Sequence, residues 1–203
     1  MFTSDPPAVV FVTEFSLCPE PPLKRLEKFA SSGADCVILR AKGLSYPEYL
    51  ALAKEALAIF SGSPSRLVLH GSPEAADELG YPYIHLPLGV LRTLDPEKRK
   101  SYKTLGASCH SADDAAEAEK AGCTYISAGH VFDTDCKKGL PGRGTDFLRE
   151  VCAAVRIPVL AIGGVAPQNA RSLYECGASG FCVMSSAMTC ADPKALVKEF
   201  KNA

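Results

Sequence analysis

Arg40 and Lys42 place two cations two residues apart, directly after the apolar run 36–39. A pair of cations at the end of a strand could attract the phosphate or carboxylate of a small ligand. A solvated pair of surface charges is the competing interpretation, and this pair alone does not decide between them. An anion site would also need backbone N–H groups or hydroxyls near the cations.

Two later segments supply such groups. Gly163 and Gly164 follow the apolar run 158–162, and Met184 and Ser185 lie at the end of the run 180–184. Glycine lets a ligand approach the main chain closely, and the N–H groups at the start of a helix bind phosphate. These four residues therefore predict a phosphate site, although glycine pairs also occur in ordinary turns.

The segment 129–144, GHVFDTDCKKGLPGRG, is long and polar for a connection within a compact domain. Such loops are often lids or binding loops, and the glycines would allow this one to fold over a ligand. Thr134 and Lys137 are expected to contact that ligand. An imidazole titrates close to neutral pH, so His130 is the residue best suited to take and return a proton.

The remaining histidines and the cysteines are weaker candidates. His70 and His110 follow apolar runs and could line the same site, whereas His85 lies within a run and is expected to be a satisfied core residue. Cys109 and Cys136 would need a base within reach to act as nucleophiles. The sequence has no H-E-x-x-H or C-x-x-C motif, so we expect no metal and no cofactor.

The elements that position these residues are short apolar runs separated by helical segments. We predict strands at 8–12, 36–39, 66–69, 83–86, 104–108, 125–128, 158–162 and 180–184, and helices at 23–31, 46–60, 112–121, 147–155, 167–176 and 193–201. The runs do not alternate with polar residues, which is typical of parallel strands buried on both faces. The segments after the third and fourth strands are left unassigned.

Three helical segments end in similar phrases, SSGAD, KAGCT and ECGAS, each with a glycine before the next strand. This recurrence indicates a repeated βα unit. No G-x-G-x-x-G follows the first strand, which disfavours an open dinucleotide-binding sheet. We therefore predict a single-domain α/β fold, a (β/α)₈ TIM barrel over residues 1–203, with the site at the carboxyl ends of its strands.

Composition limits the partners. The formal net charge is −1 and the charges are interspersed, which indicates neither a nucleic-acid partner nor an anionic membrane surface. Residues 1–7 lack the basic and apolar regions of a signal peptide, and several cysteines lie in apolar runs. We expect a cytoplasmic protein with reduced thiols that acts on a small molecule, as a monomer or homo-oligomer.

With these residues assembled, the chain resembles the thiamin phosphate synthase superfamily over nearly its whole length. Segments 108–111, 161–164 and 183–185 agree with the superfamily, and 129–139 with 142–144 resembles its thiazole tautomerase branch. The resemblance implies isomerisation of a carboxylated thiazole ethyl phosphate to its aromatic tautomer. It implies His130 as the catalytic residue, and a substrate site formed by Arg40, Lys42, His70, Ser108, Thr134, Lys137, Gly163, Gly164, Met184 and Ser185.

The same resemblance exposes departures from the synthases. There, an Asn-Asp pair after the third strand and an Asp after the fourth hold magnesium and pyrophosphate, whereas this chain has His70-Gly71 and Leu88-Gly89-Val90. His130 also replaces a proline. These departures favour the tautomerase over a thiamin phosphate synthase, which would have to work without magnesium or with residual activity. A non-catalytic phosphate-binding regulatory barrel, or an isomerase of sugar phosphates, would also account for the phosphate site.

Overall fold

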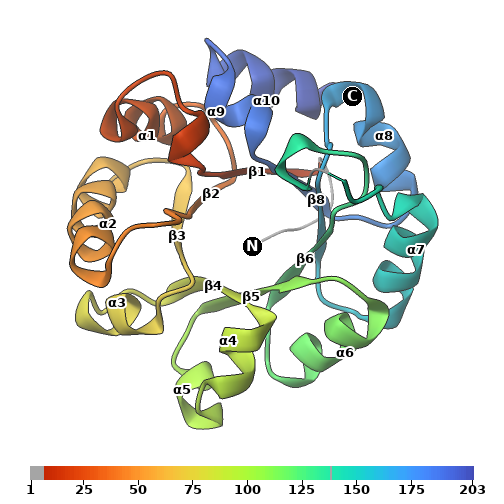
Figure 1. Ribbon diagram of the computed structural model, residues 1–203, viewed down its shortest axis with the longest axis horizontal. Helices are drawn as coiled ribbons and strands as arrows, with labels where there is room; N and C mark the ends of the chain where they lie inside the picture. The colour runs from red at the N-terminus through yellow and green to blue at the C-terminus, as the bar shows by residue number, and fades with distance from the viewer. Residues whose placement is uncertain (1–6, 138) are drawn as a thin grey trace.

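The computed structural model describes residues 7–137 and 139–203, which form a closed barrel of parallel strands in sequential order. Figure 1 looks into this ring of strands, with the helices around its outside. The strands are β1 (Ala8–Val12), β2 (Cys36–Leu39), β3 (Arg66–His70), β4 (Tyr83–Pro87), β5 (Thr104–Cys109), β6 (Tyr125–Gly129), β7 (Val159–Ile162) and β8 (Gly180–Val183). The predicted single-domain TIM barrel is confirmed.

The helices cover the outer face of the barrel. They are α1 (Pro22–Ala30), α2 (Tyr46–Phe60), α3 (Pro73–Glu78), α4 (Leu88–Thr93), α5 (Pro96–Lys100), α6 (Ala112–Lys120), α7 (Gly144–Ala154), α8 (Pro167–Glu175), α9 (Ser185–Thr189) and α10 (Pro193–Lys201), with 3₁₀ turns η1 (Phe15–Leu17) and η2 (Asp135–Lys137). Several begin with a proline behind a capping side chain, as at Ser72, Asp95 and Asp192.

The predicted elements are largely confirmed, and the differences have physical causes. The unassigned segments after β3 and β4 form α3, α4 and α5, which are only five or six residues long and too short for a clear apolar period. Helix α7 begins at Gly144, before the predicted start at residue 147, because its first turn is polar. The glycines of the three repeated phrases, Gly33, Gly122 and Gly177, have the positive φ expected of helix ends.

Both faces of the strands are buried, which explains their continuous apolar runs. One set of side chains, including Val10, Ile38, Val68 and Tyr125, packs inside the barrel. Alternate residues such as Val9, Phe11 and Val37 belong to the larger cluster between the sheet and the helices.

The barrel closes where β1 pairs with β8, with Ala8 opposite Gly180. A Cβ at Gly180 would lie 2.3 Å from the backbone oxygen of Ala8, so this position of the seam requires glycine. None of the described helices is long and apolar enough to cross a membrane. Residues 1–6, part of the segment compared with a signal peptide, lie outside the described residues.

Candidate active site

A cavity of about 1200 Å³ opens at the carboxyl ends of the strands. Of the predicted site residues, ten line it: Arg40, His70, Ser108, His130, Thr134, Lys137, Gly163, Gly164, Met184 and Ser185. They come from β3 and β5 and from the segments that follow β2, β6, β7 and β8. The barrel thus brings together residues that are up to 145 positions apart in the chain, from 40 to 185.

Lys42 does not line this cavity, so the prediction that Arg40 and Lys42 act as a cation pair at one site is wrong. It lines a smaller, adjacent cavity of about 660 Å³ between the segments after β2 and β3, and that cavity shares Arg40 and His70 with the larger one. The Lys42 side chain is exposed. The reason is that β2 ends at Leu39, so the chain has already turned outward toward α2 at residue 42.

Arg40 is held in place by the segment after β1. Its guanidinium forms an ion pair with Glu14, and the hydroxyl of Thr13 donates to the Arg40 carbonyl over 2.6 Å. Burial alone would raise the pKa of Glu14, but its hydrogen bonds to Arg40 and Ser16 and the charge of Arg40 hold that pKa below its usual value. Arg40 therefore faces the cavity with its orientation fixed by a charged partner.

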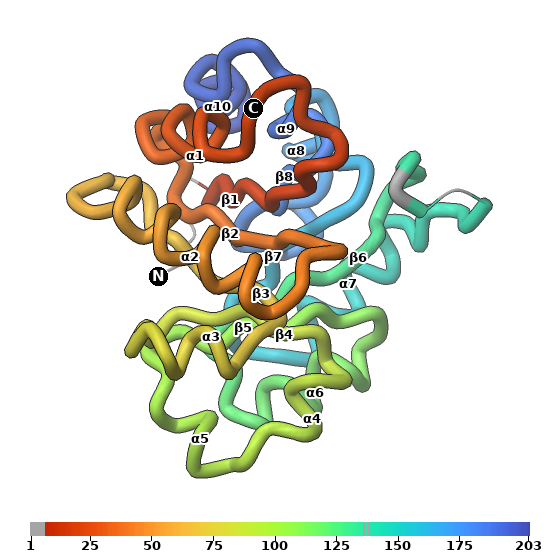
Figure 2. The backbone as a smooth tube through the Cα atoms, turned by 60° about the vertical axis from the view of Figure 1, so that its left-hand side comes forward, coloured from red at the N-terminus to blue at the C-terminus, as the bar shows by residue number. Residues whose placement is uncertain are grey.

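The long segment after β6 projects from the barrel, as the teal tube of Figure 2 shows, and several of its residues line the cavity. His130 lies at its base, and the Nε2 of His130 is 3.1 Å from the carbonyl oxygen of Pro141 and 3.3 Å from that of Leu140. Since both partners are acceptors, Nε2 carries the proton that it donates. The imidazole thus joins the two ends of the segment.

Gly163 and Gly164 do more than leave room for a ligand. Both have positive φ, and a Cβ at Gly163 would lie 2.3 Å from Cβ of His130. The amide N–H of Phe132 donates to the Gly163 carbonyl over 3.0 Å. The glycine pair therefore lets the segment after β6 pack directly on the end of β7, a packing role that the sequence interpretation did not include.

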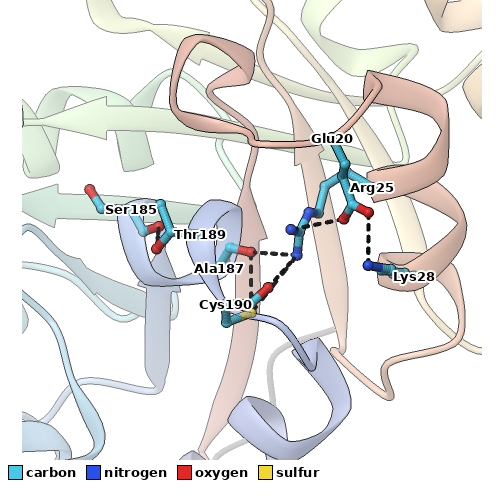
Figure 3. A network of polar contacts seen from close by, with 7 residues as sticks. All are labelled: Glu20, Arg25, Lys28, Ser185, Ala187, Thr189 and Cys190. Carbon is cyan, nitrogen blue, oxygen red and sulfur yellow. Dashed lines mark hydrogen bonds and ion pairs between the residues drawn. The ribbon is translucent and has the colours of Figure 1, made fainter.

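The short helix α9 carries Ser185 at its first position and is anchored from behind by Arg25 of α1 (Figure 3). The Arg25 side chain is only 2% exposed and pairs with Glu20 over 2.8 Å. Its Nη1 donates to the carbonyl oxygens of Cys190, at 2.9 Å, and Ala187, at 3.4 Å. A buried cation thus satisfies carbonyl groups at the carboxyl end of α9.

The floor of the cavity contains residues that the sequence did not identify as functional. His85, predicted to be a satisfied core residue, is indeed buried and hydrogen-bonded at both ring nitrogens, yet it also lines the cavity together with Ser127. Tyr125 hydrogen-bonds to the ring of His85 from inside the barrel. Residues 85, 125 and 127 lie in β4 and β6, the two neighbours of the strand that carries Ser108. The sequence of one apolar strand does not reveal which of its side chains point into the barrel, so these residues could not be assigned to the cavity.

His110 and Cys109 lie at the end of β5, where the strand reaches the cavity. His110 lines the cavity, and the Nδ1 of His110 lies 2.8 Å from the carbonyl oxygen of Gly129. Cys109 is fully buried, and burial raises the pKa of its thiol to about 12. This pKa does not suit a nucleophile. The side chain of Cys136 lies outside the described residues, whereas the eight described cysteines are free thiols.

The residues at the metal-binding positions of the synthases do not fit a magnesium ion. Burial, with the nearby charge of Arg40, lowers the pKa of His70 to about 4, and this neutral nitrogen ligand is unlike the oxygen ligands that Mg²⁺ requires. After β4, helix α4 starts at once, and Leu88 packs into the core where a carboxylate would be needed. Among residues 7–137 and 139–203, no group of three or more His, Cys, Asp or Glu side chains could hold a metal ion.

Comparisons with known proteins extend over almost the whole chain. Residues 9–187 match the family described as thiamine monophosphate synthase. The thiamine-phosphate synthase of Pyrococcus abyssi (strain GE5 / Orsay) is 30% identical, with 94% of this chain and 91% of that protein covered. That of Chlorobium phaeovibrioides (strain DSM 265 / 1930) is 31% identical, with 99% and 97% covered. A solved thiamine phosphate pyrophosphorylase from Pyrococcus furiosus has a TM-score of 0.81 at 26% identity, with 96% of this chain and 94% of that chain covered.

These relatives overturn the expectation of a thiazole tautomerase and of an isomerase. The proteins at about 30% identity, and the solved structure, carry the synthase name. The expectation rested on the segment 129–144, on His130 in place of a proline and on two missing carboxylates. That segment is a projecting loop, and loops vary more freely among relatives than the barrel that supports them. The predicted proton shuttle by His130 belonged to that assignment, and its participation in catalysis stays a prediction.

Proposed function

Because the chain belongs to the thiamine monophosphate synthase family, and is thus an enzyme of thiamine biosynthesis, we propose that it is a thiamine-phosphate synthase. It joins a phosphorylated thiazole to a pyrimidine that carries a pyrophosphate leaving group. The thiazole nitrogen supplies the electron pair for a new bond to the methylene carbon of the pyrimidine. The C–O bond to pyrophosphate breaks at the same carbon, and its electron pair leaves with the pyrophosphate.

The observation that carries this proposal is the distribution of groups around the cavity. Gly163, Gly164 and Ser185 lie together at the ends of β7 and β8, where they suit the thiazole phosphate. Arg40 and Lys137 come from the segments after β2 and β6 and suit a second anion. A cavity of about 1200 Å³ has room for two small substrates.

Since the residues at the ends of β3 and β4 do not suit magnesium, we assign the stabilisation of the leaving pyrophosphate to side chains. Arg40 is oriented by Glu14, and Lys137 belongs to η2 in the projecting segment. Fixed cations beside a leaving group stabilise its developing charge without a proton transfer. Substrate binding then requires two anion sites in one cavity, one at the ends of β7 and β8 and one formed by Arg40 and Lys137.

Product formation from both precursors tests the proposal directly. Purified protein is incubated with the thiazole phosphate and the pyrimidine pyrophosphate, with and without a chelator, and thiamine phosphate is measured after oxidation to its fluorescent thiochrome. We expect turnover that the chelator does not abolish. Failure to form product under either condition, while both precursors bind, would refute the synthase assignment and favour a binding protein.

A charge variant tests how the leaving group is stabilised. Lys137→Gln should lower kcat/KM by about tenfold or more, because a charge-assisted hydrogen bond contributes roughly 1.5–3 kcal/mol. Lys54→Gln is the matched control, since Lys54 pairs with Glu78 on the outer helices and does not line the cavity. Equal losses in the two variants, or activity only with added magnesium, would contradict the role given to Lys137.

A further inference from the structure

A row of polar side chains crosses the otherwise apolar interior of the barrel. The Tyr125 hydroxyl lies 2.9 Å from Nδ1 of His85, and Nε2 of His85 lies 2.9 Å from the hydroxyl oxygen of Ser108. Tyr125 is 0% exposed and His85 is 2% exposed, whereas Ser108 is partly open to the cavity. The row therefore runs from the buried core to the cavity surface and ends on the Ser108 hydroxyl, to which the neighbouring Ser127 hydroxyl donates over 3.5 Å.

The neighbouring strand β5 is shaped around this contact. A Cβ at Gly106 would lie 2.3 Å from Cζ of Tyr125 and 2.6 Å from Nδ1 of His85. Any larger residue would force the two rings apart. The His85 ring is thus held at both nitrogens and has a dedicated space, so it fixes the position of the Ser108 oxygen more strictly than a rotating serine side chain would.

The floor is polar but uncharged. Burial lowers the pKa of His70 to about 4 and that of His85 well below its usual value, so both rings are neutral near pH 7. The two imidazoles stack with ring centroids 5.7 Å apart. The cations Arg40 and Lys137 also line the cavity. A ligand with a phosphate and an uncharged aromatic ring matches both environments, because an anion on the floor would lose hydration without gaining a charged partner.

We propose that Tyr125 and His85 are positioning residues that hold the Ser108 hydroxyl against the uncharged heteroaromatic ring of the substrate. The floor then selects the ring, while the anion-binding groups at the mouth retain the phosphate. That this ring is a thiazole rests on the proposed function. The positioning itself rests on the contacts and on the space left by Gly106.

Binding measurements separate the two parts of the ligand. Isothermal titration calorimetry compares the thiazole phosphate with inorganic phosphate, for the wild type and for Ser108→Ala, Tyr125→Phe and the double variant. We expect the Kd for the thiazole phosphate to rise about tenfold in each single variant, the effect of losing one buried hydrogen bond, while the Kd for inorganic phosphate stays constant. The double variant should bind no more weakly than Ser108→Ala, because both changes remove the same contact.

The control is Tyr81→Phe, which removes a tyrosine hydroxyl bonded to the Leu67 carbonyl over 2.8 Å, away from the cavity. It should leave both Kd values unchanged. Should Tyr125→Phe fail to fold, as judged by circular dichroism, His85→Gln serves in its place. Wild-type affinity in Tyr125→Phe, additive losses in the double variant, an equal loss of phosphate binding, or no binding of the thiazole phosphate by the wild type would each overturn the positioning role.

The outcome is independent of the synthase assay. If the wild type forms no thiamine phosphate but the tenfold and non-additive losses in ring binding appear, the proposed function fails and the positioning role stands. If product forms but the variants bind normally, the synthase assignment stands and the positioning role fails.

Discussion

His70 makes the fold sensitive to acid. Its imidazole is largely buried beside Arg40 and His85, and burial is the main reason why its pKa falls from 6.5 to about 4. In the unfolded chain the same ring is protonated below about pH 6.5. Between these pH values the unfolded state binds more protons than the folded state, so the free energy of unfolding falls as the pH falls and levels off below about pH 4.

The magnitude follows from the two pKa values. One pKa unit corresponds to about 1.36 kcal/mol, so the difference between 6.5 and about 4 contributes about 3 kcal/mol to the free energy of unfolding. Roughly 2 kcal/mol of this contribution is lost between pH 7 and pH 5. His85 contributes in the same direction because its pKa is also lowered by burial. For a domain whose stability is typically 5–15 kcal/mol, these losses are easily measured.

The assay is urea unfolding at several pH values, followed by circular dichroism, for the wild type and His70→Asn. The variant lacks the titrating ring, so its stability should fall by about 2 kcal/mol less than that of the wild type between pH 7 and pH 5. Val68→Ala on the same strand is the control, because it opens a cavity inside the barrel and should lower stability equally at every pH. Parallel curves for the wild type and His70→Asn would show that the ring is not held neutral by the fold.

Three further predictions concern packing and reactivity. Gly163→Ala should lower the free energy of unfolding in urea by about 2–4 kcal/mol, since its φ is positive and the new Cβ would overlap His130. Gly33 also has a positive φ but open space around it, so Gly33→Ala should lower it by only about 1 kcal/mol. Arg25→Met should lower the free energy of unfolding by about 3–5 kcal/mol because it removes the buried partner of Glu20 and of the carbonyl oxygens at the end of α9. Lys28→Met should lower it by no more than about 1 kcal/mol, since Lys28 is partly exposed. Similar melting temperatures for the two variants would contradict this reasoning. In native protein at pH 8, mass spectrometry should find Cys109 unmodified by iodoacetamide and labelled only after unfolding; rapid native labelling would show an accessible thiolate.

The barrel was predictable because its signals are local and repeated. Each strand is an apolar run, and the glycines at positions 33, 122 and 177 mark the same junction three times. The short helices α4 and α5 were not predictable, since five or six residues carry too little periodicity.

The rim of the site could be predicted because barrel geometry places every strand end at one face. Its floor could not, since the contact of His85 with Ser108 joins residues 23 positions apart on two strands and depends on register. Lys42 shows the opposite limit, because it lies only three residues past the end of β2 and no longer lines the larger cavity. The predicted reaction was wrong because the loop 129–144, His130 in place of a proline and two missing carboxylates were weighted above similarity along the whole chain.

The seam between β1 and β8 has a consequence for synthesis of the protein. From the moment β1 leaves the ribosome, one of its edges has no partner until residues 180–183 have been made, so an exposed row of amide groups persists through most of translation. Pairing β8 with β1 also costs the conformational entropy of the long chain between them, so we expect this pairing to form late in folding. Nascent chains that stop short of β8 should therefore be the species that chaperones bind and that aggregate first.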